Sequence, residues 1–394
     1  MIRQDMNNRL HRTRKILRYI TFTVIVILLM SLSTDIGRSS IKAFLFIPQV
    51  ISGAPRPLEY VTPSPSRESI NFLTLNGQQA KADLYIPAGK NRHPAVVFFM
   101  GVIPPDSDDS RIIALAEGLA RTGMIVMIPW LDTQYNNRIE ESDIAKLVDA
   151  FIYLEDHPQV KRGEIGMGGI CTGASMITIA AQDLRINERV KFINSFAGYY
   201  DASDFIVATM SETRFYDGNN DPWKPNRLTR RLIIDHLISN SHTKDRFIID
   251  KVMEKGTWTE IEERQLSENG QAILTLLSKP TTKVAQEAIQ NLSKENKDFL
   301  SRISPSTKIS NMRADVLIMH DTFDTMVPSE ESKRFAESLK TNTFVNDVYH
   351  TEFTLFQNAV QVHSESEQSI STLAFINQAW KLYKHMYNIM RLSH

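Results

Sequence analysis

Residues 164–175 read Glu-Ile-Gly-Met-Gly-Gly-Ile-Cys-Thr-Gly-Ala-Ser, and the rest of the chain is organised around them. The pattern predicts a short apolar strand that passes through a sharp turn into a helix. Cys171 lies at the apex of this turn, between Gly169 and Gly173 in a G-x-C-x-G pattern. A Cβ atom at either glycine would clash in so tight a turn. We therefore expect a strained strand-to-helix elbow that presents the Cys171 thiol above a β-sheet.

The elbow position favours a nucleophilic thiol. Such a thiol is exposed, faces the positive end of the following helix and lies beside the backbone N–H of Thr172. These features predict an accessible Cys171 with a lowered pKa. The alternative is a glycine-rich turn whose cysteine is a small buried apolar residue, the commoner fate of an isolated cysteine.

The composition narrows the possible functions. The chain has 394 residues, with 45 Lys and Arg balancing 45 Asp and Glu. No net charge attracts nucleic acid, so a nucleic-acid partner is not expected. Cys171 is the single cysteine, which excludes an intramolecular disulfide and a cysteine-based metal cluster. No spacing of histidines and carboxylates suggests a metal site, and no cofactor is predicted.

Residues 1–34 are predicted to be a basic head followed by a membrane segment. The uncharged run over 19–34 is somewhat shorter than the roughly 20 residues that cross a bilayer. We favour an uncleaved anchor over a signal peptide cleaved near residues 31–33. Because the basic residues come first, the head is expected in the cytoplasm and the catalytic domain outside it. Secretion after cleavage is the alternative.

Residues 35–68 are predicted to be a proline-rich stalk. Prolines repeat over 53–67, which favours an extended, semi-rigid spacer without a core of its own. The apolar patch at 43–47 is expected to compensate at the membrane for the short segment before it.

Strands and helices alternate over the core, which is predicted at 69–199 and 311–394. Strands are expected at 70–75, 82–86, 95–100, 124–128, before Cys171, at 190–196, at 314–319 and within 345–356. Helices are expected between them and after the last strand, where Leu373, Ile376, Trp380, Tyr383 and Tyr387 form a stripe. This β-α alternation predicts an α/β fold with a doubly wound, mostly parallel sheet.

Residues 200–310 interrupt this rhythm. They contain no clear strand, and their apolar residues are spaced as on helix faces. We expect an inserted helical cap over the active site, one that governs substrate choice, because the insertion follows a strand on the elbow side of the sheet. A helical elaboration or a partner-binding surface is the alternative.

Three positions complete a catalytic set. A cysteine nucleophile needs a base and a group that orients the base, and Cys171, Asp324 and His363 follow one another in the order nucleophile, acid, histidine. With the elbow, with residues 320–328 (His-Asp-Thr-Phe-Asp-Thr-Met-Val-Pro) and with His363 before the last helix, the chain resembles the α/β-hydrolase superfamily. It is most similar to the dienelactone hydrolase-like branch, which uses cysteine in the elbow.

The resemblance covers roughly residues 71–387 outside the insertion and departs from the family pattern in two ways. One departure is the long insertion, and the other is Met100, where a histidine is usual before Gly101. The fold and mechanism do not depend on that histidine, because the oxyanion hole needs backbone N–H groups, expected from Thr172 and Val102.

Other residues compete for these roles. Asp321 precedes Asp324 by three positions, but the acid is usually deeper in this turn, just before Val-Pro. Asp201 is a further possible acid. His350 lies in or beside the last strand, where a structural histidine is expected, and His320 is expected to support the turn.

The predicted activity is hydrolysis of a carboxylic ester, lactone or thioester through an acyl-enzyme. The expected partners are a small acyl substrate with an apolar portion and, for the N-terminal segment, the lipid bilayer. An acyltransferase with the same triad is the alternative enzyme. A catalytically inactive, membrane-tethered binding module is the alternative from another class, and the intact nucleophile, acid and base argue against it.

Overall fold

The structure is a computed structural model that describes residues 33–51, 53–102, 107–354 and 372–393, together with Lys15, Arg18, Tyr19 and Thr23. The basic head and membrane segment predicted over 1–34 fall almost entirely outside the described residues. Within the part that is described, no helix is both long and apolar enough to cross a membrane.

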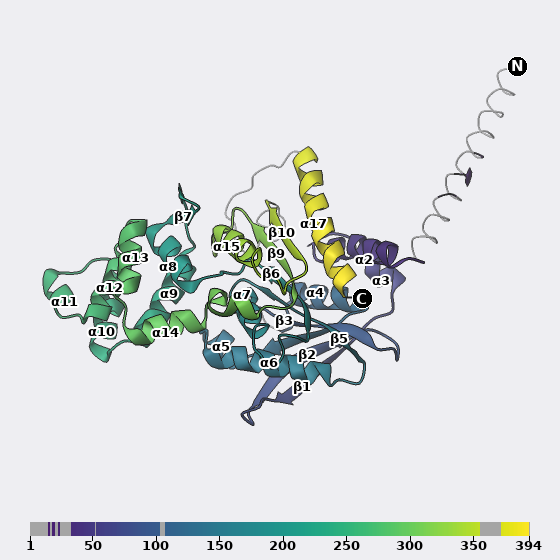
Figure 1. The fold of residues 1–394 in the computed structure, drawn as a ribbon, viewed down its shortest axis with the longest axis horizontal. Helices are drawn as coiled ribbons and strands as arrows, with labels where there is room; N and C mark the ends of the chain where they lie inside the picture. Colours follow the sequence, from purple (N-terminus) through teal and green to yellow (C-terminus); the bar gives the residue numbers. More distant parts are fainter. Residues whose placement is uncertain are drawn as a thin grey trace, which may run out of the picture.

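The described residues form a central sheet of eight strands (Figure 1). The strands are β1 (Ser66–Leu73), β2 (Gln79–Ile86), β3 (His93–Phe99), β4 (Ile125–Trp130), β5 (Val160–Ile170), β6 (Val190–Phe196), β9 (Asp315–Asp321) and β10 (Val348–Phe353). Their order is β1-β2-β4-β3-β5-β6-β9-β10. The pairs β1–β2 and β2–β4 are antiparallel, and every later pair is parallel.

Helices cover both faces of the sheet, as parallel sheets require. One face packs against α6 (Glu141–Glu155), α7 (Thr172–Ala180) and α15 (Glu330–Leu339), and the other against α2 (Asp35–Gln49), α4 (Ser110–Arg121) and α17 (Thr372–Leu392). The short helices α3 (Pro57–Val61) and α5 (Asp132–Tyr135) complete the core with the 3-10 helix at Pro305–Asn311. The predicted α/β class and mostly parallel sheet are confirmed, and the arrangement matches the α/β-hydrolase type.

The extended, coreless stalk predicted over 35–68 is wrong. Thr34 caps α2, whose Ala43 and Phe46 are 0% and 2% exposed among residues of α4 and α17. Helices α2 and α4 cross closely at Gly118 of α4, where an added Cβ would lie 3.1 Å from the Phe46 ring. Ala43 and Phe46 of the apolar patch that we assigned to the membrane are therefore part of the protein core, because α2 is amphipathic and its apolar face packs against protein, while Phe44 is exposed.

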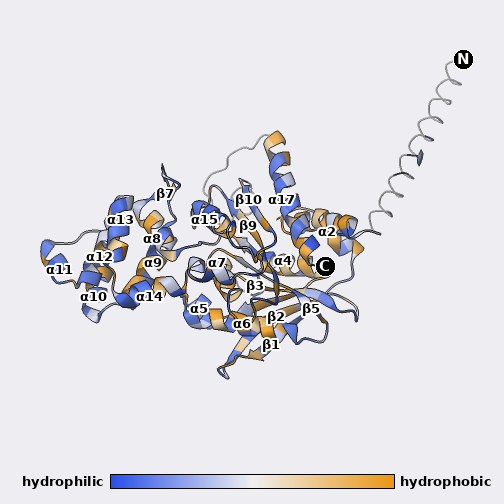
Figure 2. Ribbon diagram, in the orientation of Figure 1, coloured by the Kyte–Doolittle hydropathy of each residue, from blue (hydrophilic) through white to orange (hydrophobic). Residues whose placement is uncertain are grey.

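Helices dominate residues 202–302, which extend to one side of the sheet (Figure 1). They are α8 (Ala202–Ser211), α9 (Arg227–Ser239), α10 (Thr243–Lys255), α11 (Glu260–Arg264), α12 (Glu268–Leu277), α13 (Thr282–Gln290) and α14 (Lys294–Arg302). These helices share an apolar cluster of their own, which also contacts Cys171 and Met326. Hydrophilic residues predominate on the outer helices of this region, whereas the sheet is mainly hydrophobic (Figure 2).

The same region contains a hairpin that we did not predict. Strands β7 (Thr213–Tyr216) and β8 (Asn219–Pro222) pair antiparallel across Asp217 and Gly218. Both turn residues have positive φ angles, 49° and 79°. An Asp-Gly pair with this backbone is a typical two-residue hairpin turn, so the signal was present in the sequence.

Candidate active site

Cys171 forms the sharp turn between β5 and α7. Its φ and ψ angles are 54° and −131°, a strained conformation for a residue with a side chain. There is no room for a side chain at Gly169 or Gly173. An added Cβ on Gly169 would lie 2.7 Å from the carbonyl carbon of Gly173, and an added Cβ on Gly173 would lie 2.5 Å from Gly101 N. The turn can close this tightly only because both positions are glycine.

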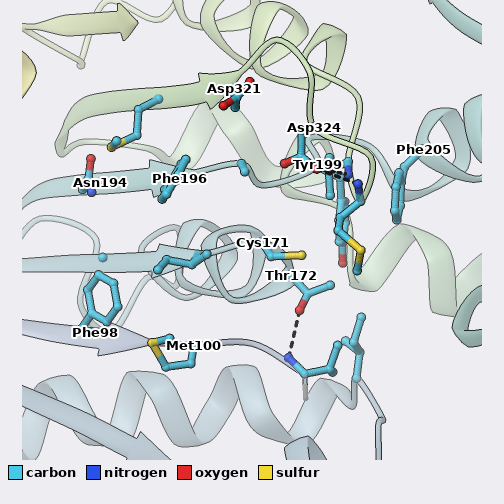
Figure 3. Close-up of a pocket in the computed structure, with 18 of the residues that line it drawn as sticks. Phe98, Met100, Cys171, Thr172, Asn194, Phe196, Tyr199, Phe205, Asp321 and Asp324 are labelled. Carbon is cyan, nitrogen blue, oxygen red and sulfur yellow. Dashed lines mark hydrogen bonds between the residues drawn. The ribbon is translucent and has the colours of Figure 1, made fainter. Parts of the chain in front are cut away.

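The loop after β3 lies directly against this elbow. The backbone N–H of Val102 donates a hydrogen bond to Thr172 Oγ1 over 3.0 Å, the bond drawn from Thr172 in Figure 3. The buried Gln134 side chain holds the same loop, because its Nε2 donates to Gly101 O over 2.7 Å. The N–H of Val102 thus lies against the elbow, at the residue that follows Cys171.

Burial, not the helix terminus, dominates the pKa of Cys171. Burial and, to a smaller extent, the charge of Asp324 raise this pKa to about 12, against the lowering effect of the backbone N–H of Thr172. The lowered pKa that we predicted from the elbow is therefore wrong for the described surroundings of Cys171, because burial outweighs the effect of the helix terminus. A thiolate at neutral pH requires a base or cation in addition to the described residues.

Asp324 lies in the turn after β9, and its charge acts on Cys171. Its Oδ1 accepts hydrogen bonds from the backbone N–H groups of Met326, over 2.6 Å, and Val327, over 3.2 Å. Burial raises the pKa of Asp324 to about 7, against the lowering effect of these two bonds. Asp321 lines the same cavity, and its Oδ1 accepts from the N–H of Phe323 within the turn. The structure therefore brings Cys171, Thr172, Val102 and Asp324 together around one cavity.

His363 lies outside the described residues. The described chain shows where its segment leaves the sheet: Phe353, in the last strand, pairs with Asp321, and its carbonyl accepts the N–H of Thr322 over 2.9 Å. The segment therefore starts beside the turn that carries Asp324. His363 comes ten positions after Phe353, and a chain of that length spans at most about 33 Å.

The competing residues have structural partners. His320 is completely buried, and its Nε2 donates to Val327 O over 3.0 Å, which ties the turn to β9. His350 contacts Ser332 Oγ through Nε2. Asp201 caps α8 by accepting the N–H groups of Ser203 and Asp204. None of these contacts involves Cys171.

The cavity at Cys171 has a volume of about 470 Å³ and is strongly apolar. Figure 3 shows Cys171 between side chains of the sheet, including Phe98 and Asn194, and side chains near the cap, including Tyr199 and Phe205. We name the two parts the sheet arm and the cap arm. The sheet arm is lined by Phe98, Ile170 and Phe196 of the strands and by Val50, Leu115 and Met386 of the facing helical layer. The cap arm is lined by Phe205, Ile206, Leu232, Ile233, Phe299 and Leu300.

Sequence reasoning missed three residues that shape this site. Besides Gln134, Glu331 is completely buried and accepts the N–H groups of Tyr200 and Asp201, where the chain enters the cap. Tyr199 donates its hydroxyl to Ile303 O and so joins the two ends of the insertion. No local signal marks these residues, because their partners lie far away in the chain.

Comparison with solved structures gives similarities of the chain trace. The acylaminoacyl peptidase of Pyrococcus horikoshii aligns with a TM-score of 0.49 and 14% identity over 85% of this chain and 42% of that one. A hyperthermophilic esterase from the archaeon Pyrobaculum calidifontis aligns with a TM-score of 0.46 and 14% identity over 89% of this chain and 90% of the esterase. The dipeptidyl peptidase 4 of Porphyromonas gingivalis aligns with a TM-score of 0.45 and 12% identity over 82% of this chain and 36% of the peptidase.

This chain spans less than half the length of either peptidase. No protein-family model matches the chain. No curated protein matches it either. The α/β-hydrolase type of fold follows from the strand order and the elbow on their own.

Proposed function

We propose that this protein hydrolyses a carboxylic ester or thioester with Cys171 as the nucleophile. The observation that carries the proposal is the strained elbow, which holds the only thiol of the chain at an apolar cavity. Strain at a residue with a side chain persists only where the surrounding structure maintains it, and it clusters at functional sites. A cysteine kept merely as a small apolar residue needs no such backbone.

In the proposed reaction, His363 takes the proton of Cys171 while Asp324 orients the imidazole. The thiolate attacks the carbonyl carbon, and the N–H groups of Thr172 and Val102 hold the oxyanion. The bond to the leaving alcohol or thiol breaks, and His363 gives that group its proton. Water, deprotonated by His363, then attacks the acyl-enzyme thioester, releases the carboxylic acid and regenerates Cys171.

The raised pKa of Cys171 makes the base essential to this mechanism. With the pKa of the thiol raised to about 12, the described surroundings keep the sulfur protonated at neutral pH. Attack therefore has to be coupled to proton removal. Support for His363 in this role comes from Phe353, where the segment that carries His363 begins, because Phe353 lies beside the turn that carries Asp324.

The membrane anchor, a cytoplasmic N-terminus and an extracytoplasmic catalytic domain belong to the same proposal. Their support is the basic head and the uncharged run over 19–34. The similarity to the dienelactone hydrolase-like branch also enters here, through the cysteine elbow. Acyl transfer to an amine or alcohol uses the same steps, with that nucleophile in place of water.

The test is to trap the acyl-enzyme. The full chain, mixed with an acyl thioester and quenched in acid, is expected to gain the mass of one acyl group on Cys171, followed by free acid in solution. Cys171→Ala should abolish both, and His363→Ala should slow acylation by about 10²-fold or more. Unchanged turnover in Cys171→Ala would refute the proposal.

A further inference from the structure

The sheet arm is a continuous feature of one sheet face. Side chains of strand residues two apart point to the same face, and Val96, Phe98 and Met100 follow this spacing toward Val102. Phe192, Asn194 and Phe196 repeat it on β6 and lead to Ala197. Four residues of strand span about 13 Å, so the arm runs deep between the sheet and the helices.

Two glycines on β5 explain why this space is open. An added Cβ on Gly166 would collide with the ring of Phe192, and one on Gly168 would lie 2.9 Å from Phe98 Cδ2. The two rings therefore lie over the glycines rather than across the gap between sheet and helices. The opposite wall includes Leu115 and Leu119 of α4, Val50 at the end of α2, and Leu382, Met386 and Ile389 of α17.

The sheet arm offers almost nothing polar to a ligand. Asn194 is the polar side chain on its strand wall, and its Oδ1 accepts a hydrogen bond from His385 Nε2 over 2.8 Å. Cavities of this kind stay dry and take apolar ligands. The cap arm differs, because the Thr229 hydroxyl also lines it and its oxygen can accept a hydrogen bond. His236 lines it too, but both of its ring nitrogens are hydrogen-bonded to the backbone of Leu232 and Ile139.

We propose that the sheet arm holds the alkyl chain of a long-chain acyl substrate, with its carbonyl at Cys171 and its leaving group in the cap arm. The inference rests on the proposed function and names its substrate class. An unbranched chain without polar atoms fits an apolar passage that begins at the nucleophile and continues along the strands. The leaving group, which carries heteroatoms, then lies on the side of the Thr229 hydroxyl, while the charged Arg111 of α4, which also lines the cavity, is paired with Asp109.

The kinetic test compares two variants on one helix. Leu115→Trp fills the sheet arm, whereas Ile113→Trp places the same side chain two residues away, at a position that does not line the cavity. For the wild type, kcat/KM should rise from butyryl to dodecanoyl thioesters, by at most about fourfold per buried methylene. Leu115→Trp should lower the ratio of the dodecanoyl to the butyryl kcat/KM at least tenfold, and Ile113→Trp should leave this ratio unchanged.

Val50→Trp, from the α2 side, repeats the test if Leu115→Trp unfolds. A cap variant, Leu232→Trp, decides between the arms: if it shortens the preferred chain and the two sheet-arm variants do not, the inference is overturned. Offering the dodecanoyl group as a soluble thioester and as a lipid ester in phosphatidylcholine vesicles distinguishes a soluble from a membrane-held donor. Selective loss in Leu115→Trp with either donor supports the inference.

A binding experiment separates this inference from the reaction. Dodecanol should bind to Cys171→Ala, and Leu115→Trp in that background should weaken binding at least tenfold by titration calorimetry, with Ile113→Trp as the control. If dodecanol binds in this way but the wild type turns over no ester or thioester, the proposed function is refuted and the sheet arm remains a binding site for alkyl chains. If short substrates are turned over but dodecanol does not bind, the proposed function is supported and the inference about the sheet arm is refuted.

Discussion

The backbone N–H of Val102 donates its hydrogen bond to the side chain of Thr172, the residue next to Cys171. In the resting protein the hydroxyl of one elbow residue therefore occupies a donor that the proposed oxyanion needs. A hydroxyl can rotate away when a stronger acceptor arrives, and a charged oxyanion is such an acceptor. The contact keeps the loop after β3 in position without closing the site.

Replacing Thr172 tests this contact. Thr172→Val keeps the shape but leaves the N–H of Val102 without its acceptor, so the free energy of unfolding should fall by about 1 kcal/mol. The kcat/KM should fall about tenfold, because the loop is no longer held. Thr172→Ser restores the hydroxyl and should recover both values in chemical denaturation and steady-state assays. Equal losses in the serine variant would mean that the methyl group, not the hydrogen bond, matters.

Replacing an elbow glycine by alanine should cost far more stability than replacing a glycine elsewhere in the chain. Gly173→Ala pushes a Cβ against backbone atoms of Phe99 and Gly101, which cannot move aside, so we expect a loss above about 3 kcal/mol or no folded protein. Gly163→Ala meets no atom within 4 Å and retains only the strain of its φ of 81°, which costs about 1 kcal/mol. Urea unfolding of both variants measures the difference. Similar values would argue against the close approach of β3 and α7.

Helix α2 should be indispensable to the folded domain. Removal of residues 1–33 leaves α2 in place and should preserve the fold, whereas removal of residues 1–65 strips Ala43 and Phe46 from the core and should give an aggregating or molten protein. Circular dichroism and gel filtration distinguish the two.

Single variants of α2 refine this prediction. Phe46→Ala should cost about 3 kcal/mol, and Phe44→Ala, at a position 68% exposed, should cost almost nothing. A stable domain without α2 would mean that the sheet face beneath it needs no cover.

The reactivity of Cys171 should depend on His363. In His363→Ala, burial and the charge of Asp324 should keep the pKa of the thiol raised toward 12, so alkylation by iodoacetamide should continue to accelerate up to the highest pH at which the protein is folded. In the wild type, a nearby imidazolium should bring the rise down toward neutral pH. Mass spectrometry of the single cysteine gives both rates. Identical profiles would show that His363 is not the base.

Buried neutral histidine should make stability depend on pH. Burial lowers the pKa of His385 to about 3, below the ordinary 6.5 that it regains on unfolding. Between these values the unfolded chain binds one more proton, so this residue contributes stability above pH 6.5 that is lost as the pH falls toward 3, by about 1.4 kcal/mol per pH unit.

The matched variant is His385→Gln, whose unfolding free energy should depend less steeply on pH than that of the wild type between pH 4 and 6.5. Glu331→Gln is the opposite control. Burial raises the pKa of Glu331 from 4.5 to about 7, so its contribution is present below pH 4.5 and lost as the pH rises through 7. Parallel curves for wild type and His385→Gln would contradict the buried, neutral histidine.

The sequence alone was sufficient for elements whose signals are local. The apolar runs of β3 and β9, the glycines around Cys171 and the β-α alternation each carry their pattern within a few residues, so the α/β class, the mostly parallel sheet and the elbow were predictable. The Asp217-Gly218 hairpin belongs with them, although we did not predict it.

Only the tertiary structure decided which partner each apolar face meets. Residues 43–47 are apolar whether they meet protein or membrane, and only packing against α4 and α17 shows that Ala43 and Phe46 are part of the protein core. The stripe predicted along the last helix is largely exposed at Leu373, Ile376 and Trp380, while Leu382, Met386 and Ile389 line the cavity.

The pKa of Cys171 and the sheet arm are tertiary properties for the same reason. The desolvation that raises the pKa of the thiol comes from segments hundreds of residues apart in the chain, and the open arm exists because two phenylalanine rings lie over glycines of a neighbouring strand. Hydrophobicity is non-directional, so a sequence shows that an apolar side chain will be buried, but not against what. Long-range contacts supply that direction, and they determine where in this protein an acyl chain can lie.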